Sequence, residues 1–179
     1  MEQTSTLFNG TYLRICRRQG WEYAERANAR AAVIIVAVTP DDCVVLVEQF
    51  RIPVNASSIE MPAGLVGDLA GDESIEEAAR RELIEETGWR AGRIEYLMSG
   101  PSSSGMSNEQ VAFVRARDLV RIGPGGGDAS EDISVHEIPR TEVAAWLDAR
   151  RREGFSIDPK LYAGLYFISH NPDGSSAGT

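Results

Sequence analysis

The residues of this chain best suited to chemistry lie in a short acidic run, RELIEETGW, at residues 81–89. Just before it, Ser74 is followed three residues later by Glu77, which is the pattern of a helix capping box. Gly88 is of the residue type that commonly ends a helix. The sequence therefore predicts a helix between Ser74 and Gly88 that carries the acidic run at its C-terminal end.

Three glutamates fall on the apolar side of this predicted helix. With about 100° of rotation per residue, Glu82 and Glu86 lie within about 20° of Ile75, and Glu85 lies roughly 80° away. The helix dipole disfavours carboxylates at a C-terminal end, and clustered carboxylates repel one another. Divalent cations held by oxygen ligands would compensate this charge, so we expect a metal site here.

The alternative for an acidic helix is a solvated face whose carboxylates form salt bridges with Arg80 and Arg81. The spacing of the whole stretch favours the metal site. Gly67 is followed after five residues by Glu73, and after seven more by residues 81–89. This set of fixed positions closely resembles the signature box of the Nudix hydrolases.

The resemblance implies a magnesium site with a supporting frame. Mg²⁺, with Mn²⁺ able to replace it, would be bound by Glu82, Glu85 and Glu86, and Glu85 and Glu86 would be catalytic. In the family, the residues that match Gly67, Glu73 and Arg81 brace the junction between loop and helix. Arg81 also has acidic residues four positions away on both sides, which is equally consistent with a purely structural ion pair.

Two segments before the helix narrow the resemblance. QFRIP at residues 49–53 and EMPAG at residues 60–64 are similar to motifs of ADP-ribose pyrophosphatases and their nucleoside-diphosphate-sugar relatives. The resemblance implies that the carbonyl of Ala63 binds metal and that Arg51 and Glu60 contact substrate; without it, Arg51 could be a surface cation. In those relatives the glycine of the second motif opens the box, whereas here Gly64 precedes Gly67 by three residues.

Two later loops complete the predicted site. GMSNE at residues 105–109 resembles a substrate loop of the same subfamily and assigns Ser107 and Glu109 to substrate, although Glu109 could also bind metal or simply begin a strand. Two prolines usual upstream are serines here, which weakens the assignment to ADP-ribose in particular. The resemblance implies that the general base comes from an acidic loop, here residues 128–133, in which Glu131 is the candidate for the base or for an additional metal ligand, with Asp128 in reserve. Glycines 125–127 would let this loop move; the alternative is a solvated loop without a catalytic part.

The elements expected around these residues suggest a layered α/β fold. A hairpin is predicted from residues 11–16 and 21–26, and a second, central hairpin from the buried runs 31–38 and 43–50. The remaining predicted strands and helices are 58–61, 93–98, 109–115, 133–138, 141–152 and 158–169. The resemblance implies an α/β/α sandwich around a mixed sheet. We expect a single domain over residues 1–170 with an N-terminal β-hairpin, and a disordered tail over residues 171–179.

Composition bounds the partners and the location. The formal charge of −9 argues against a nucleic-acid-binding surface. A phosphorylated substrate would also be repelled by this charge, unless metal ions and nearby arginines make the local charge of the site positive. Cys16 and Cys43 lie in apolar runs and are expected to be buried free thiols, as in a reducing cytosol. No signal peptide or membrane-spanning run is evident, so we predict a soluble cytoplasmic protein that does not bind membranes.

Taken together, the sequence predicts a Mg²⁺-dependent hydrolase of a nucleoside diphosphate sugar, with ADP-ribose giving AMP and ribose 5-phosphate. The alternative substrate is GDP-mannose or another nucleotide sugar. A non-catalytic ligand-sensing module is a remote alternative, because such modules generally lose box glutamates. The resemblance also implies a homodimer that shares substrate contacts through the N-terminal strands, where Trp21 and Tyr23 could lie at the interface, stack on adenine or only pack the sheet.

Overall fold

A mixed sheet lies at the centre of the molecule, in the order β7-β4-β9-β8. The computed structural model describes residues 4–68, 72–127 and 131–178. Strands β4 and β9 run parallel, whereas β4 with β7 and β9 with β8 run antiparallel. The strands are β4 (Ala31–Ala37), β7 (Ala63–Val66), β8 (Trp89–Pro101) and β9 (Gln110–Arg121).

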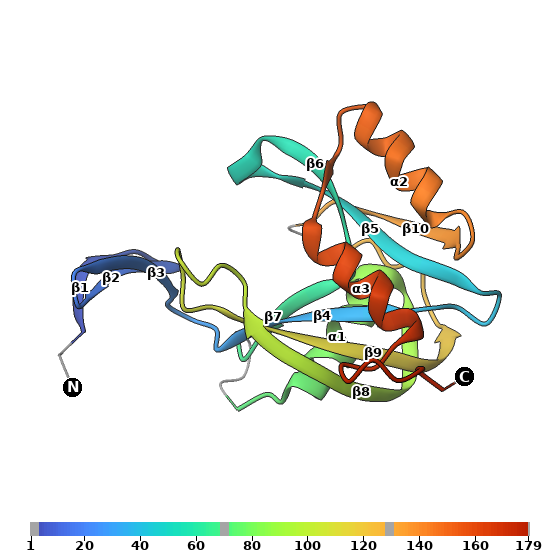
Figure 1. Ribbon diagram of the computed structural model, residues 1–179, viewed down its shortest axis with the longest axis horizontal. Helices are drawn as coiled ribbons and strands as arrows, with labels where there is room; N and C mark the ends of the chain where they lie inside the picture. The colour runs from blue at the N-terminus through green and yellow to red at the C-terminus, as the bar shows by residue number, and fades with distance from the viewer. Residues whose placement is uncertain (1–3, 69–71, 128–130, 179) are drawn as a thin grey trace.

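Helices cover both faces of this sheet (Figure 1). Side chains of β4 alternate between two hydrophobic clusters. Val33 and Ile35 join the cluster that contains Leu83 of α1 (Ile75–Thr87). Ile34 and Val36 join the cluster of Leu161 and other residues of α3 (Pro159–Ser169). This double burial explains the continuous β-branched run and confirms the predicted α/β/α architecture.

A second sheet holds the remaining strands of the body, in the order β10-β5-β6-β11. Its members are β5 (Cys43–Arg51), β6 (Ala56–Glu60), β10 (Ile133–Pro139) and β11 (Ser156–Ile157), and the short 3₁₀ helix η1 (Ile52–Val54) joins β5 to β6. Helix α2 (Val143–Arg152) packs on it by burying Val143 and Leu147.

The predicted central hairpin of residues 31–38 and 43–50 is wrong in its pairing. Strands β4 and β5 belong to different sheets, and among the described residues their backbones are hydrogen-bonded to each other at the turn between them, where the Thr39 N–H donates to the Cys43 carbonyl (2.8 Å) beside an isolated bridge between Val38 and Val44. Both edges of β4 are occupied by β7 and β9, so β5 finds its hydrogen-bonding partners in β6 and β10.

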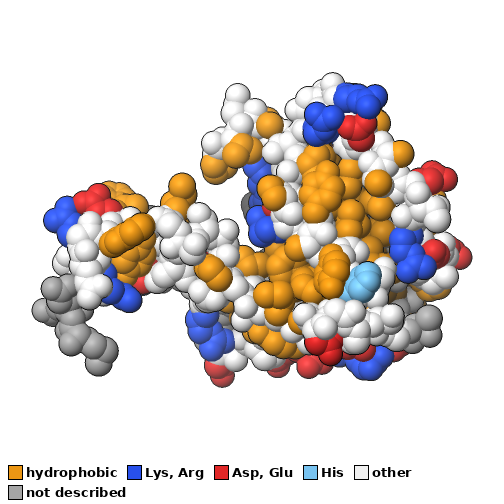
Figure 2. Space-filling view, viewed as in Figure 1, with side chains coloured by type: hydrophobic (Ala, Val, Ile, Leu, Met, Phe, Trp, Pro, Cys, Tyr) orange, Lys and Arg blue, Asp and Glu red, His pale blue; other side chains and the backbone are white. Residues whose placement is uncertain are grey.

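The N-terminal residues form a separate small sheet that projects from the body (Figure 1). The predicted hairpin is present as β2 (Leu13–Arg18) and β3 (Trp21–Arg26), and β1 (Ser5–Asn9) adds to its edge. The space-filling view shows hydrophobic side chains on this projecting sheet and over α3 (Figure 2). Residues 102–109 connect the sheet to the body, because the Ala24 N–H donates to the Met106 carbonyl (2.8 Å).

The C-terminal segment and one of the two cysteines differ from expectation. Residues 171–178, for which we predicted disorder, fold back on the body, where the Ala177 N–H donates to the Ser169 carbonyl (2.8 Å). The buried guanidinium of Arg115 donates to the carbonyls of Phe167 and His170 and so anchors the end of α3.

Of the two free thiols, Cys16 is buried and Cys43 is only partly buried. In the described part of the chain, every helix is too short or too polar to cross a bilayer.

Candidate active site

Helix α1 has the boundaries and caps that the sequence predicts. The Glu77 N–H donates to the Ser74 hydroxyl (3.2 Å), and the Glu77 carboxylate accepts the Ser74 N–H (2.8 Å). Gly88 ends the helix with φ of 72°, a left-handed conformation that glycine adopts without strain. The register of the acidic run relative to the sheet is therefore fixed at both ends of the helix.

The glutamates of α1 differ in burial. Glu86 is 4% exposed and accepts a hydrogen bond from the Ala63 N–H (3.0 Å). The side chain of Glu82 is 12% exposed, whereas that of Glu85 is 44% exposed. The rotation predicted from the sequence is correct for Glu82 and Glu86, which point inward, whereas Glu85, also expected on the apolar side, is turned toward solvent.

Burial makes the charged forms of the two inner carboxylates costly. Burial raises the pKa of Glu86 to about 8, the nearby charges of Glu82 and Glu131 add to this, and the Ala63 N–H opposes it. Burial likewise raises the pKa of Glu82 to about 7, against the lowering influence of Arg81. The protein therefore holds two carboxylates whose negative charge its own groups compensate only in part.

Arg81 connects the helix to the preceding loop. Its guanidinium donates to Glu73 (3.0 Å), Glu82 (2.8 Å) and Glu85 (3.2 Å). Glu73 in turn accepts the N–H of Gly67 (3.2 Å), which has a φ of 82°. The three residues expected to brace the box thus form one hydrogen-bonded chain.

The two glycines near the start of the box have different positions. Gly67 forms the turn that donates to Glu73. Gly64 lies in β7, and a Cβ there would lie 1.9 Å from the Cδ of Glu82. Gly64 therefore leaves the space that the Glu82 carboxylate occupies, while Gly67 makes the structural start of the box.

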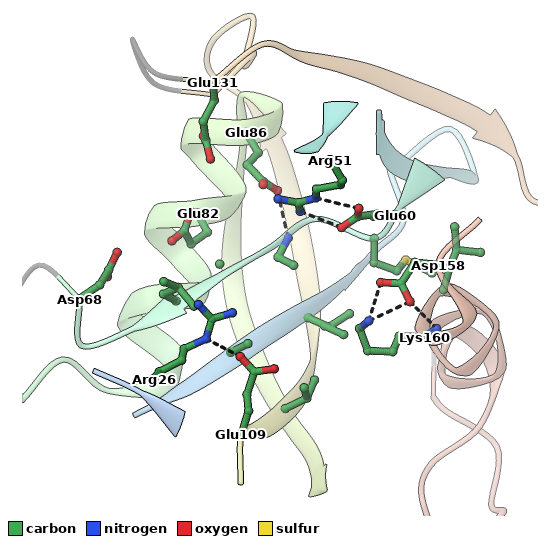
Figure 3. Close-up of a pocket in the computed structure, with 18 residues that line it drawn as sticks. Arg26, Arg51, Glu60, Asp68, Glu82, Glu86, Glu109, Glu131, Asp158 and Lys160 are labelled. Atoms are coloured by element: carbon green, nitrogen blue, oxygen red, sulfur yellow. Dashed lines mark hydrogen bonds and ion pairs between the residues drawn. The ribbon is translucent and has the colours of Figure 1, made fainter. Parts of the chain in front are cut away.

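These residues surround a cavity of about 490 Å³ between α1, the end of the N-terminal sheet and α3. Figure 3 shows two chemically different walls. The wall on the α1 side carries carboxylates, those of Asp68, Glu82, Glu86 and Glu131. The opposite wall carries cations, each with a carboxylate partner.

Among the described residues, three cation–carboxylate pairs line this second wall. Arg51 donates to both oxygens of Glu60 (2.9 and 2.8 Å), Arg26 pairs with Glu109, and Lys160 with Asp158 (2.7 Å). Arg51, Glu60 and Glu109 were predicted from their motifs. Sequence reasoning missed Arg26, Lys160 and Asp158, although Lys160 is the only lysine of the chain and stands at a predicted helix start.

Two of the residues predicted to bind metal or substrate, Glu85 and Ser107, lie outside the lining of this cavity. Ser107 lies instead beside Trp21 and Tyr23, in a separate pocket between β3 and the loop of residues 102–109. Its hydroxyl is 3.2 Å from that of Ser102. Glu85 is held by Arg81 at the outer side of α1. Asp128, the reserve for the general base, lies outside the described residues.

The glycines expected to free the acidic loop are hydrogen-bonded to α1. The N–H groups of Gly126 and Gly127 donate to the carbonyls of Glu86 (2.8 Å) and Glu85 (3.0 Å). The segment before the acidic loop is therefore seated on the helix end, and Glu131 lines the cavity next to Glu86.

The donor set suits a hard divalent cation. Carboxylate oxygens of Glu82, Glu86 and Glu131 line one cavity with Ala63, and Mg²⁺ prefers such oxygen ligands with room for water and phosphate. Within residues 4–68, 72–127 and 131–178, no three acidic, histidine or cysteine side chains are already arranged to hold a metal. Arg81 and the Ala63 N–H occupy the carboxylates instead.

The fold and the site together define an α/β/α hydrolase-type domain with an acidic helix at its cavity. The family model described as NUDIX domain matches residues 28–156, more than half of the chain. The chain therefore belongs to the NUDIX family, which confirms the family and the enzyme class predicted from residues 67–89.

Relatives with assigned names support a more specific comparison. A GDP-mannose pyrophosphatase of Pectobacterium atrosepticum is 37% identical over 131 residues, covering 70% of this chain and 68% of that protein. An ADP-sugar pyrophosphatase of Mus musculus is 36% identical over 136 residues, covering 72% and 61%. An ADP-ribose pyrophosphatase of Escherichia coli is 34% identical over 151 residues, covering 79% and 68%. A crystal structure of an ADP compounds hydrolase has the same fold, with a TM-score of 0.70 and 21% identity over 93% of this chain and 89% of that chain.

The Arg51–Glu60 pair predicts a pH-dependent stability. Burial alone would raise the pKa of Glu60, but the hydrogen bonds and charge of Arg51 outweigh it and lower that pKa below its usual value. The ionised pair therefore stabilises the fold above the unfolded-state pKa, and this contribution is lost as pH falls through the folded-state pKa. We expect Glu60→Gln to lower the free energy of unfolding by about 1–2 kcal/mol at neutral pH.

Urea unfolding of both proteins at several pH values measures this difference. The difference in the free energy of unfolding between wild type and Glu60→Gln should disappear as the pH falls below the ordinary glutamate pKa of about 4.3. Glu76→Gln, which removes an exposed pair with Arg80 on α1, is the control and should change stability by less than about 0.5 kcal/mol. An unchanged gap at acidic pH would contradict the assignment.

Proposed function

We propose that this chain is a Mg²⁺-dependent hydrolase of the diphosphate bond in a nucleoside diphosphate sugar, with ADP-ribose as substrate and AMP and ribose 5-phosphate as products. The observation that carries the proposal is the two-walled cavity, with carboxylates on α1 facing the cationic side chains of Arg26, Arg51 and Lys160. The names of the relatives from Mus musculus and Escherichia coli support the substrate class.

In this proposal Glu82, Glu85 and Glu86, with the Ala63 carbonyl, hold Mg²⁺, and Mn²⁺ can replace it. The bound ion supplies charge neutralisation for the diphosphate and lowers the pKa of the attacking water. Glu85 lies on the same helix, where it is bonded to Arg81 outside the cavity lining, so a metal contact requires it to leave Arg81 and turn toward the cavity. Gly67, Glu73 and Arg81 keep the helix in register with β7, the strand that begins at Ala63.

The chain's own groups bind and orient the substrate. Arg51 is held by both oxygens of Glu60, which fixes the plane of its guanidinium at the cavity. Together with Lys160 and Arg26 it offsets the negative charge of a diphosphate in a protein whose net charge is −9. Glu131, next to Glu86 on the acidic wall, is the general base that accepts the proton of the attacking water.

A second substrate, GDP-mannose, is favoured by a specific observation. Ser107 of the predicted substrate loop lies outside the cavity, on the pocket of Trp21 and Tyr23. Of the two residues that this loop was expected to contribute, Glu109 lines the described cavity and Ser107 does not, so the contacts expected for ADP-ribose are present only in part. The name of the Pectobacterium atrosepticum relative is consistent with this alternative.

A substrate panel separates the two. We expect purified protein with Mg²⁺ to hydrolyse ADP-ribose with a kcat/KM at least about tenfold above that for GDP-mannose, a difference of about 1.4 kcal/mol in transition-state binding. Mass spectrometry should identify AMP and ribose 5-phosphate. A reversed preference would establish the alternative, and equal rates for all bases and sugars would defeat both assignments while leaving the family unchanged.

Loss of an α1 carboxylate tests the metal site. We expect Glu85→Gln and Glu86→Gln each to lower kcat by at least about a hundredfold at saturating Mg²⁺, because a ligand that holds the catalytic charge is removed. Excess EDTA should abolish wild-type turnover, and added Mg²⁺ should restore it. Glu76→Gln is the matched control, since it makes the same change on the exposed face of the same helix. Turnover of the two variants within a few-fold of wild type would refute the metal site.

Two further properties belong to the proposal. A cytoplasmic location is supported by the two free thiols. A homodimer is supported by the projecting N-terminal sheet, on which Phe8, Tyr12 and Trp21 are 63%, 69% and 67% exposed. The charge and the cavity chemistry give no role to nucleic acid or to a membrane.

Sedimentation equilibrium tests the homodimer. A mass near twice 19.5 kDa is expected for the wild type at micromolar concentration. Replacing Phe8 and Trp21 by serine should shift the protein toward the monomer, because it removes apolar area from the projecting sheet. A wild-type mass of 19.5 kDa would exclude the dimer under those conditions.

A further inference from the structure

The glycine run Gly125–Gly127 has a backbone that other residues rarely adopt. Its φ angles are 74°, 111° and 83°, all in the region where a side chain causes strain. The run follows β9 and precedes the acidic loop. A Cβ on Gly125 would lie 2.4 Å from the carbonyl carbon of Thr87, so the run lies directly against the end of α1.

One end of the run is bonded to the helix residues that carry the site. The last carbonyls of a helix have no partner inside it. Here the Glu86 carbonyl accepts the N–H of Gly126 (2.8 Å), and the Glu85 carbonyl accepts the N–H of Gly127 (3.0 Å). These two N–H groups also bring partial positive charge to the C-terminal end of α1, where the negative end of the helix dipole disfavours carboxylates.

The middle residue of the run is also bonded to the start of β10. The Gly126 carbonyl accepts the N–H of Ile133 (3.2 Å). Gly126 thus connects the backbone of Glu86 to that of Ile133 through its N–H and its carbonyl. Glu131 lies between Gly126 and Ile133 in the sequence. A Cβ on Gly127 would lie 2.7 Å from the Cβ of Glu131 and 2.8 Å from its Oε2.

We propose that Gly125–Gly127 is a positioning element that fixes Glu131 relative to Glu86 on the acidic wall of the cavity. The absence of side chains lets the run lie against both the end of α1 and the Glu131 side chain. This inference rests on the proposed function, in which Glu131 is the general base and Glu86 a metal ligand. A change in the run acts on the reaction through Glu131.

Substitution of Gly127 tests the proposal. We expect Gly127→Ala to lower kcat by about a hundredfold, the loss typical of a catalytic group displaced by about 1 Å, with KM changed by less than about threefold. Gly127→Asn is the second variant, for the case that Gly127→Ala folds poorly. Its Cβ would press on Glu131 in the same way, but asparagine tolerates positive φ better than alanine. It should therefore show the same loss of kcat.

Two control substitutions separate displacement of Glu131 from other effects. Gly123→Ala changes the same segment where a Cβ meets nothing within 4 Å. Gly154→Ala imposes positive-φ strain, since the φ of Gly154 is 97°, but a Cβ there also meets nothing within 4 Å. Both should keep kcat within about twofold of wild type, because neither displaces Glu131.

A double-mutant cycle tests whether the run acts through Glu131. Glu131→Gln should itself lower kcat, and adding Gly127→Ala should then change it by less than about threefold, because the affected group is already removed. Full additivity of the two effects would overturn the proposal. So would wild-type activity of either Gly127 variant, or of Glu131→Gln.

Binding of Mn²⁺ to the protein without substrate, measured by electron paramagnetic resonance, gives a readout independent of turnover. Displacing the Glu131 carboxylate from the acidic wall should weaken binding at least about threefold in Gly127→Ala and leave Gly123→Ala and Gly154→Ala unchanged. If the wild type hydrolyses no nucleotide sugar, the proposed function fails, and this measurement still decides the inference. Equal Mn²⁺ affinity in all four proteins would overturn it.

Discussion

Burial of the Glu82 and Glu86 carboxylates against the central sheet is the constraint on which the rest of the site depends. Their pKa values, raised to about 7 and about 8, show that the charged forms are under-compensated. Arg81, the Ala63 N–H and the glycine run at the helix end each offset part of this charge. The remaining deficit is what a divalent cation supplies, so the helix is built to be completed by one.

The same constraint explains why the opposite wall is neutral in net charge. Unpaired arginines facing buried carboxylates would be attracted to them and would fill the space that substrate and metal need. Pairing Arg51 with Glu60 and Arg26 with Glu109 gives each of these cations a carboxylate partner of its own. The Arg26–Glu109 pair also ties the N-terminal sheet to the start of β9, so the projecting sheet contributes to the cavity as well as to the surface.

Local sequence signals predicted the local structure well. The capping box, Gly88 and the inward rotation of Glu82 and Glu86 follow from spacing within one helix, and the structure reproduces them. Strand partners were not predictable in the same way, because the pairing of β5 depends on which strands already occupy the edges of β4. Arg26 and Lys160 were missed for the same reason: the fold brings the end of β3 and the start of α3 to a cavity that no single motif describes.

The single lysine has a practical consequence. Lys160 lies at the edge of the cavity with its side chain 43% exposed, and every other basic side chain except the histidines is arginine. Apart from the α-amino group, an amine-directed reagent therefore has one attachment point, and it lies beside the bound substrate of the proposed reaction. A fluorophore coupled there would report on cavity occupancy without any engineered cysteine, and a lysine-specific protease would cut the unfolded chain at one position.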